Sequence, residues 1–435
     1  MNMLHPEFET LDPSEIRRVQ ENLWNRQWRY IRSHSKFYQE KLGALARREF
    51  LPLDQLIEIP FTGKEELRES QERQYPFGDY LACEPKDVVR LQTTSGTTGR
   101  ALVLANTAND LSWIARIGGR AFYTSGLRPE DRVVHCLNYC MWSGGVTDHM
   151  SLEATGACVI PFGIGQADKL LGIIRELKVT AISCTPSYPA LLEERLREAG
   201  CNPRDLGLRL GLFGGEAGLD NLQFREKLAQ AWGFSVRNAN YGMSEVMSTF
   251  ASQSEHSNDL HFHAADAIFP EIIDARGNSI PISEGNTGEL VCTHLRKESQ
   301  PIIRYRTRDL ITITGVERAK CGRTGWRFRV IGRSDDMFNV RGINVFPSSV
   351  QNIVLSFPDL FSGQFRILQR GEGPWNYIEL RVEASRTLTT DQYTAACYTL
   401  ELAIKNRIGA SAQVELLHAG SLPKTAEKTS LIERI

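Results

Sequence analysis

The chain has 435 residues, of which 41% are hydrophobic and 24% are charged. These proportions are typical of a soluble globular protein, and the length suffices for two or more domains with a large core. Lysine plus arginine (51) nearly balances aspartate plus glutamate (52), so the net charge of −1 lacks the basic excess that favours nucleic acid. No apolar run reaches the ~18 residues of a membrane helix, so no membrane partner is expected.

The N-terminal segment and the cysteines favour a cytoplasmic location. Residues 1–10 contain acidic side chains and no apolar stretch, which is not typical of a signal peptide. The nine cysteines are irregularly spaced and include no Cys-x-x-Cys pair. An odd number at such spacing is typical of reduced thiols rather than of a disulfide framework.

Helical spacing dominates the first predicted elements. Hydrophobic residues recur at helical intervals among charges over residues 14–42, which predicts a surface helix or a pair of helices. A short strand is predicted over residues 87–91, directly before a segment of very different composition.

That segment, residues 93–99, reads Thr-Thr-Ser-Gly-Thr-Thr-Gly and is called the hydroxyl-rich loop below. Glycine permits tight turns and a close approach of the backbone to a ligand. Hydroxyls and successive backbone N–H groups can surround an anion, so the composition predicts a polyphosphate site. No Gly-Lys-Ser/Thr follows the last glycine, so the loop is not the P-loop of kinases and ATPases.

Strand-like and helix-like segments then alternate, which predicts sheets covered by helices. The expected strands are residues 133–137, 157–161, 181–183 and 208–213, and the expected helices are residues 167–177 and 188–199. After about residue 264 the pattern is richer in strands, expected at residues 268–273, 288–292, 310–315 and 327–331.

An α+β pattern follows, with helices expected at residues 348–356 and 390–406 and strands at residues 364–368, 377–382 and 414–417. The sequence thus predicts an α/β protein. Residues 1–334 would form a large N-terminal domain of helix-covered sheets plus a β-rich subdomain. Residues 335–435 would form a small, mobile α+β C-terminal domain.

Four segments beyond the hydroxyl-rich loop reveal a family resemblance: Asn240-Tyr-Gly-Met-Ser-Glu245, Arg304-Tyr-Arg-Thr-Arg-Asp309, Gly332-Arg-Ser-Asp-Asp-Met337 and Pro423-Lys-Thr-Ala-Glu-Lys428. In this order they resemble the adenylate-forming superfamily of acyl-CoA synthetases, peptide-synthetase adenylation domains and luciferases. The resemblance is closest to the phenylacetate-CoA ligase family. Supporting segments, such as Pro60-Phe-Thr-Gly-Lys-Glu-Glu-Leu67, extend it over nearly the whole chain.

The resemblance implies an ATP-dependent carboxylic acid:CoA ligase that uses ATP, Mg²⁺ and CoA. A carboxylate would attack the α-phosphorus of ATP and expel pyrophosphate, and a thiol would then take the acyl group from the adenylate. Because both first reactants are anionic, the site must hold them in line and stabilise charge on the phosphate oxygens.

The resemblance also assigns the nucleotide site. Tyr241 would stack on adenine, Asp309 would accept hydrogen bonds from the ribose hydroxyls, and Arg333 would contact the ribose. Arg308, just before Asp309, stands where most of the superfamily has glycine and matches the phenylacetate-type variant instead. The full implied ATP-binding set is Thr93, Thr94, Ser95, Gly96, Thr97, Thr98, Gly99, Gly214, Gly215, Glu216, Asn240, Tyr241, Gly242, Met243, Ser244, Asp309 and Arg333.

Catalysis is implied for Lys428, Glu245 and Arg333. Glu245 would ligate Mg²⁺, which prefers oxygen ligands of this kind. Lys428 would bridge the carboxylate and the α-phosphate, with Lys424 as a rival. By the same resemblance, Asp335 is the hinge of the small domain and Gly342 borders the CoA channel.

Residues 137–145, called the pocket loop below, lie where the family lines its acyl pocket. The implied acyl-pocket residues are Tyr139, Met141, Trp142, Gly145 and Ala239. Aromatic side chains and glycines can supply flat apolar walls. Differences from the family pattern at Cys140, Trp142 and Ser143 favour an acid other than phenylacetate. We expect an aromatic or cyclic acid without a fixed positive charge.

Several alternatives stay open. The acyl acceptor is CoA, or instead a carrier-protein phosphopantetheine or an amine. A non-catalytic nucleotide-binding protein could keep the fold. His256, His261, His263 and Cys321 lie where some relatives hold a structural zinc, but they do not form a complete ligand set, so zinc is not expected. The family also implies a homodimer. The sequence identifies neither the acid nor the oligomeric state.

Overall fold

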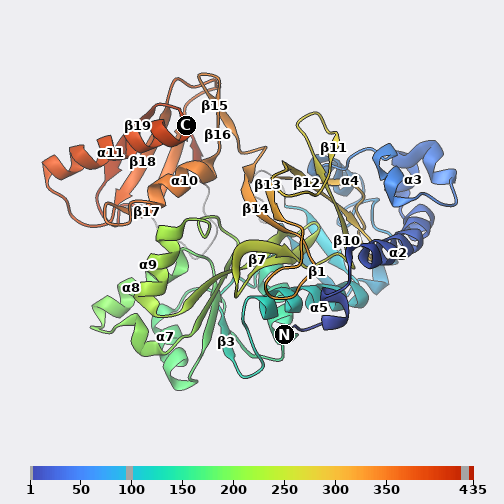
Figure 1. The fold of residues 1–435 in the computed structure, drawn as a ribbon, viewed down its shortest axis with the longest axis horizontal. Coiled ribbons are helices and arrows are strands. Elements are labelled where there is room, and N and C mark those ends of the chain that lie inside the picture. Colours follow the sequence, from blue (N-terminus) through green and yellow to red (C-terminus); the bar gives the residue numbers. More distant parts are fainter. Residues whose placement is uncertain (1–2, 95–100, 423–430) are drawn as a thin grey trace. The chain divides into compact units, whose positions relative to one another are not determined.

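The structure is a computed structural model that describes residues 3–94, 101–422 and 431–435. The chain forms two compact units (Figure 1). Unit 1 comprises residues 1–163 and 237–329, and unit 2 comprises residues 164–236 and 330–435. Among the described residues, every helix is too short or too polar to traverse a lipid bilayer.

Helices open unit 1. The segment predicted as one surface helix or a pair of helices forms two, α2 (Pro13–His34) and α3 (Lys36–Leu42). Ser35 between them caps α3 by accepting a hydrogen bond from Tyr38 N. The other helical segments up to the first strand are α1 (Pro6–Glu9), η1 (Gly43–Arg47), η2 (Leu53–Glu58), α4 (Lys64–Arg73) and η3 (Pro85–Asp87).

The hydroxyl-rich loop follows the first strand of an antiparallel pair. β1 (Arg90–Thr93) pairs with β2 (Val103–Asn106), and Thr93 stands opposite Val103. The predicted strand over residues 87–91 therefore begins later than expected. Pro85 starts a 3-10 turn that occupies the first of those positions.

Two helices carry much of the remaining packing in unit 1. α5 (Ala108–Thr124) lies against α6 (Ser143–Glu153) and against β8 (Met247–Ser254). Gly118 of α5 allows this approach, because a Cβ there would overlap the Ser151 side chain of α6. The two predicted strands here, β3 (Arg132–His135) and β4 (Cys158–Pro161), pair with each other in parallel.

The strand-rich part of unit 1 is one sheet of hydrogen-bonded neighbours in the order β11-β10-β12-β13-β14-β9-β8-β7. These strands are β7 (Ser235–Met243), β9 (Ser257–Phe262), β10 (Ile268–Ile273), β11 (Ser279–Ile280), β12 (Thr287–His294), β13 (Tyr305–Gly315) and β14 (Arg327–Arg333), together with β8. The pairings of β7 with β8 and of β12 with β13 are antiparallel. The sheet therefore brings Tyr241 and Asp309 into one unit.

Unit 2 contains two groups of elements. The first comprises α7 (Ala167–Glu176), β5 (Ala181–Cys184), α8 (Tyr188–Glu198), η4 (Pro203–Leu206), β6 (Leu210–Gly214) and α9 (Leu222–Trp232). The second comprises β15 (Phe338–Val340), β16 (Ile343–Val345), α10 (Pro347–Leu355), β17 (Phe361–Gln369), β18 (Ile378–Ala384), α11 (Thr390–Ile408), β19 (Ala412–Leu417) and β20 (Ile432–Arg434).

In the second group, α10 and α11 pack on the sheet β19-β18-β17-β20 (Figure 1). A core of buried side chains, including Val354, Ile367, Leu380 and Leu400, joins the helices to the strands. The α/β class, the large sheet and the α+β C-terminal part are thereby confirmed. The boundary between residues 334 and 335 and the mobility of the small domain stay predictions.

Candidate active site

The segment from Tyr241 to Glu245 ends β7 and turns tightly into β8. Met243 pairs with Met247, and Val246 N donates to Met243 O at 3.1 Å. Gly242 is required here, because a Cβ would overlap the carbonyl oxygens of Met247 and Ser248. The turn places Ser244 and Glu245 directly after the end of the strand.

The tyrosine of this segment is bonded to the aspartate of a distant one. Tyr241 Oη donates to Asp309 Oδ2 at 2.8 Å, across 68 positions of sequence. The Tyr241 ring also meets Phe250 and Phe328 edge-on, with ring centroids 5.2 Å away in each case. Aromatic packing and the hydrogen bond together fix both candidate nucleotide-binding side chains in unit 1.

The backbone conformation of Arg308 shows why most of the superfamily has glycine before this aspartate. Its φ of +67° lies in the left-handed region, which costs a non-glycine residue free energy. Glu289 offsets this cost, since it accepts from Arg308 N at 3.2 Å and from Arg306 Nη2 at 2.6 Å. Asp309 N in turn donates to Thr307 Oγ1 at 3.1 Å.

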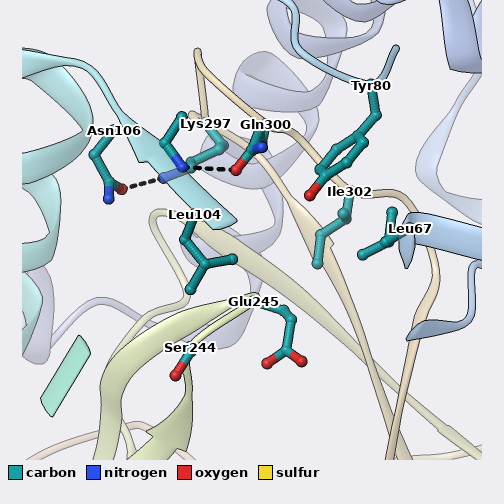
Figure 2. Close-up of a pocket in the computed structure, with 10 residues that line it drawn as sticks. Leu67, Tyr80, Leu104, Asn106, Ser244, Glu245, Lys297, Gln300 and Ile302 are labelled. Carbon is teal, nitrogen blue, oxygen red and sulfur yellow. Dashed lines mark hydrogen bonds between the residues drawn. The ribbon is translucent and has the colours of Figure 1, made fainter. Parts of the chain in front are cut away.

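The candidate magnesium ligand is paired with a lysine. Lys64 Nζ lies 2.8 Å from Glu245 Oε1, and the Glu245 side chain is only 8% exposed. Ser244 and Glu245 also line a pocket with Tyr80, Lys297 and apolar side chains (Figure 2). The Lys64 ammonium therefore neutralises a largely buried carboxylate next to this pocket. Lys64 lies in a segment that supports the family resemblance, but the sequence predicted no role for this residue.

The first two residues of the hydroxyl-rich loop, Thr93 and Thr94, are described, and hydrogen bonds hold them in place. Thr93 N donates to Met141 O at 2.7 Å, which ties the loop to the pocket loop. Thr94 Oγ1 accepts from Leu102 N at 3.0 Å, and Thr94 N donates to Leu102 O at the same distance. The Thr94 hydroxyl thus closes the base of the loop.

Aromatic rings gather along the pocket loop. Tyr139 Oη lies 3.0 Å from His149 Nδ1, and the ring of buried His135 meets that of Tyr139 edge-on. The Trp142 ring lies where a Cβ on Gly144 would be, and the carbonyl of Asn138 lies where a Cβ on Gly145 would be. The two glycines therefore let the loop fold down onto the first turn of α6.

Two other members of the implied acyl-pocket set differ in exposure. Met141 is half exposed and adopts a φ of +61°, whereas Ala239 of β7 is fully buried. Ser143 at the start of α6 is hydrogen-bonded to Ser244. The pocket loop is therefore joined directly to the Tyr241–Glu245 turn.

A buried carboxyl group that sequence reasoning missed lies one turn further along α6. Asp148 is fully buried and accepts hydrogen bonds from Asn240 Nδ2 and, at 3.0 Å, from Thr249 Oγ1. In the described part of the chain, no lysine or arginine pairs with it. Burial raises the pKa of Asp148 to about 8. The only sequence signal was an acidic residue directly after the neutral stretch Gly144–Thr147.

Unit 2 holds the remaining described candidates. Gly215 is exposed with a φ of +81°, and Glu216 Oε2 accepts from Ser187 N at 3.3 Å. Arg333 donates to both carboxylate oxygens of Asp335, at 3.0 and 2.8 Å. Gly342 is exposed at a φ of +85°, and its N–H donates to Asn339 Oδ1.

Some predicted residues lie outside the described residues: Ser95, Gly96, Thr97, Thr98, Gly99, Lys424 and Lys428. Their implied roles stay predictions. Within the described ranges, no group of three or more His, Cys, Asp or Glu side chains is arranged to hold a metal ion. His261 and His263 stack against each other, and His263 Nε2 lies 2.9 Å from Ser252 Oγ.

Comparison with known proteins identifies the family. The profile of the AMP-binding enzyme family matches residues 39–294, and that of the AMP-binding enzyme C-terminal domain matches residues 342–433. The chain belongs to the AMP-binding enzyme family. The resemblance to adenylate-forming enzymes is therefore confirmed.

Relatives with assigned activities narrow the class. The phenylacetate-coenzyme A ligase of Thermus thermophilus is 32% identical, over 97% of this chain and 97% of its own. That of Pseudomonas putida is 34% identical, over 98% of each chain. A crystal structure of 2-hydroxyisobutyryl-CoA ligase with an acyl-adenylate is 28% identical, with a TM-score of 0.90 over 99% of this chain and 92% of that one.

These findings define the chain as an AMP-forming acid–CoA ligase, which joins a carboxylic acid to coenzyme A at the expense of ATP through an acyl-adenylate. The same 2-hydroxyisobutyryl-CoA ligase, crystallised with an acyl-adenylate and CoA, matches with a TM-score of 0.72 at 29% identity.

Proposed function

We propose that this ligase activates an aromatic or cyclic carboxylic acid, with Mg²⁺ held at Glu245, and transfers the acyl group to CoA. The observation that carries the acid class is the pocket loop. It places the Trp142 ring against Gly144 at the start of α6 and the Tyr139 hydroxyl beside His149 of the same helix. The Ser143–Ser244 hydrogen bond joins the start of α6 to the Tyr241–Glu245 turn. The similarity to phenylacetate- and 2-hydroxyisobutyryl-CoA ligases supports a small acid.

The first step joins an oxygen of the acid to the α-phosphorus and breaks the bond to the leaving pyrophosphate. Asp309, held by Tyr241, would accept from the ribose hydroxyls and so fix the nucleoside. The N–H and hydroxyl groups of the hydroxyl-rich loop would bind the departing phosphates. Lys428 would neutralise charge between the carboxylate and the α-phosphate, a role that rests on the family resemblance.

Glu245 fits a magnesium ligand by its chemistry. It is a largely buried carboxylate whose charge is balanced by a displaceable ammonium, that of Lys64. Bound Mg²⁺ would offset the negative charge of the phosphates. Lys64 would then be free to turn toward the nucleotide phosphates.

The second step is attack of the CoA thiol on the acyl carbonyl, with AMP as the leaving group. Gly342, exposed and without a side chain, is proposed to border the path of the pantetheine arm. Asp335, paired with Arg333, is proposed as the hinge between the two half-reactions.

The test is acid-dependent ATP–pyrophosphate exchange across aryl, arylacetic, cyclic and fatty acids, followed by addition of CoA. We expect exchange with an aryl, arylacetic or cyclic acid and release of its CoA thioester. Exchange with fatty acids alone would contradict the acid class. Exchange without thioester release, restored by a carrier protein or an amine, would contradict CoA as the acceptor.

A further inference from the structure

The contact between Asp148 and Asn240 spans two walls of the proposed acyl pocket. Asp148 lies on α6, which begins at the pocket loop, and Asn240 lies on β7 next to Ala239. Gly144 and Asp148 are four residues apart, so they share one face of α6. The Trp142 ring covers that face at Gly144. A polar pair therefore lies one helical turn beyond an aromatic wall.

Strand geometry separates Asn240 from the nucleoside-binding side chain next to it. Successive side chains of a strand point to opposite faces. Tyr241 points toward Asp309, Phe250 and Phe328, whereas Asn240 points toward α6 and Asp148. This places the Asn240 carboxamide on the side of the pocket loop rather than on the side of the ribose-binding aspartate.

Asp148 fixes which atom of Asn240 is presented. The Asn240 amide nitrogen donates to Asp148 Oδ2, and this carboxyl oxygen can accept whether or not the group is ionised. Thr249 holds the other oxygen at 3.0 Å. Asn240 is half-buried, and within the described residues its Oδ1 accepts no hydrogen bond. The pair thus holds an oriented acceptor that a ligand can complete.

We propose that Asn240 Oδ1, oriented by Asp148, accepts a hydrogen bond from a hydroxyl or amino substituent of the acid, so that the enzyme prefers acids carrying such a group. This inference rests on the proposed function and narrows its substrate class. Asn240 is the specificity-determining residue, and Asp148 is a positioning residue that acts through it. A site built around a fixed acceptor rejects an analogue that leaves the acceptor unpaired.

The experiment compares kcat/KM for acid-dependent ATP–pyrophosphate exchange between matched acids: benzoic with hydroxy- and aminobenzoic, phenylacetic with hydroxyphenylacetic, and cyclohexanecarboxylic with its hydroxy derivative. We expect the wild-type enzyme to prefer a substituted member of at least one pair by about tenfold or more. Asn240→Leu and Asp148→Ala should remove that preference. Asp148→Asn, which keeps an oxygen that accepts from Asn240, should retain most of it.

Each ratio is taken within one protein preparation, so a partly unfolded variant does not distort it. Ser151→Ala is the matched control, because Ser151 is a fully buried residue of the same helix whose hydroxyl donates to Thr147 O. Its preference should equal that of the wild type.

Three results would overturn the inference. In the first, the unsubstituted acid of every pair is preferred, which leaves the proposed function intact. In the second, Asn240→Leu keeps the preference or changes only the KM for ATP, which would place Asn240 at adenine. In the third, no acid supports exchange, which would overturn the proposed function together with the inference.

Discussion

Tyr241 and Asp309 are joined by a 2.8 Å hydrogen bond from phenol to carboxylate. The bond orients a carboxylate that is only 7% exposed, so its two oxygens are presented in a fixed direction. A carboxylate of this kind matches the two adjacent hydroxyls of a ribose. The Tyr241 ring also packs edge-on against Phe250 and Phe328, so aromatic contacts help to hold the phenol in place.

Asp309→Ala should weaken ATP binding more than it slows the chemical step. A hydrogen bond to a charged group is worth ~1.5–3 kcal/mol, so the KM for ATP should rise about tenfold or more. Tyr241→Phe should give a smaller rise in the same direction. The measurement is the ATP dependence of pyrophosphate exchange, with Asp259→Ala, on the surface pair with Arg329, as the control. An unchanged KM for ATP would refute the ribose-binding role.

Glu245→Gln should raise the Mg²⁺ concentration needed for nucleotide binding by about tenfold, because the neutral amide is a weaker ligand for a hard cation. Lys64→Met should lower it, since Mg²⁺ would no longer displace an ammonium from the carboxylate. Titration of ATP binding with Mg²⁺ checks both, and Glu255→Gln, on a surface pair with Arg128, is the control. If ATP binding had the same dependence on Mg²⁺ in all variants, Glu245 would not be a ligand of the metal ion.

Lys428→Ala should nearly abolish formation of the adenylate while sparing thioester formation from a supplied acyl-adenylate. The reason is that the charge it is proposed to neutralise develops only in the first half-reaction. Lys424→Ala in the same segment is the matched comparison and should keep both half-reactions. Equal losses in both half-reactions, or a loss confined to Lys424→Ala, would contradict the assignment.

Ionisation of the Asp148 carboxyl group should lower the free energy of unfolding as the pH rises. Burial raises its pKa to about 8 in the folded state, whereas an unfolded aspartate has a pKa of ~3.9. The folded state therefore holds a proton that the unfolded state has released, and folding is progressively disfavoured from the lower value up to the higher one. Unfolding by urea at pH 5 and pH 8.5 should show a steeper loss of free energy in the wild type than in Asp148→Asn. Equal losses of free energy in the wild type and in Asp148→Asn would show that folding does not raise the pKa of Asp148.

The sequence motifs predicted candidate residues where these residues lie close together in the sequence. The Tyr241–Glu245 segment and Asp309 were both predicted to bind the nucleotide because each belongs to a family motif, and in the structure Tyr241 donates a hydrogen bond to Asp309. Arg308 was noted as a departure from glycine, but only its φ of +67° shows that the position requires a left-handed backbone.

Pairings between distant segments could not be predicted in the same way. The contacts of Lys64 with Glu245 and of Asp148 with Asn240 depend on how α4, α6 and β7 meet, which no local pattern encodes. Among the elements, the amphipathic α2 and the apolar strands β5 and β6 were predictable from periodicity. α5 was missed, because its ten buried residues include the charged Asp110 and Arg120, so charge does not mark its exposed face.

The most direct test of the account uses an acid labelled with ¹⁸O in its carboxylate. If the carboxylate attacks the α-phosphorus and CoA then attacks the carbonyl, AMP should carry one ¹⁸O atom for each thioester formed, and pyrophosphate should carry none. AMP without label, or label in pyrophosphate, would contradict an acyl-adenylate pathway.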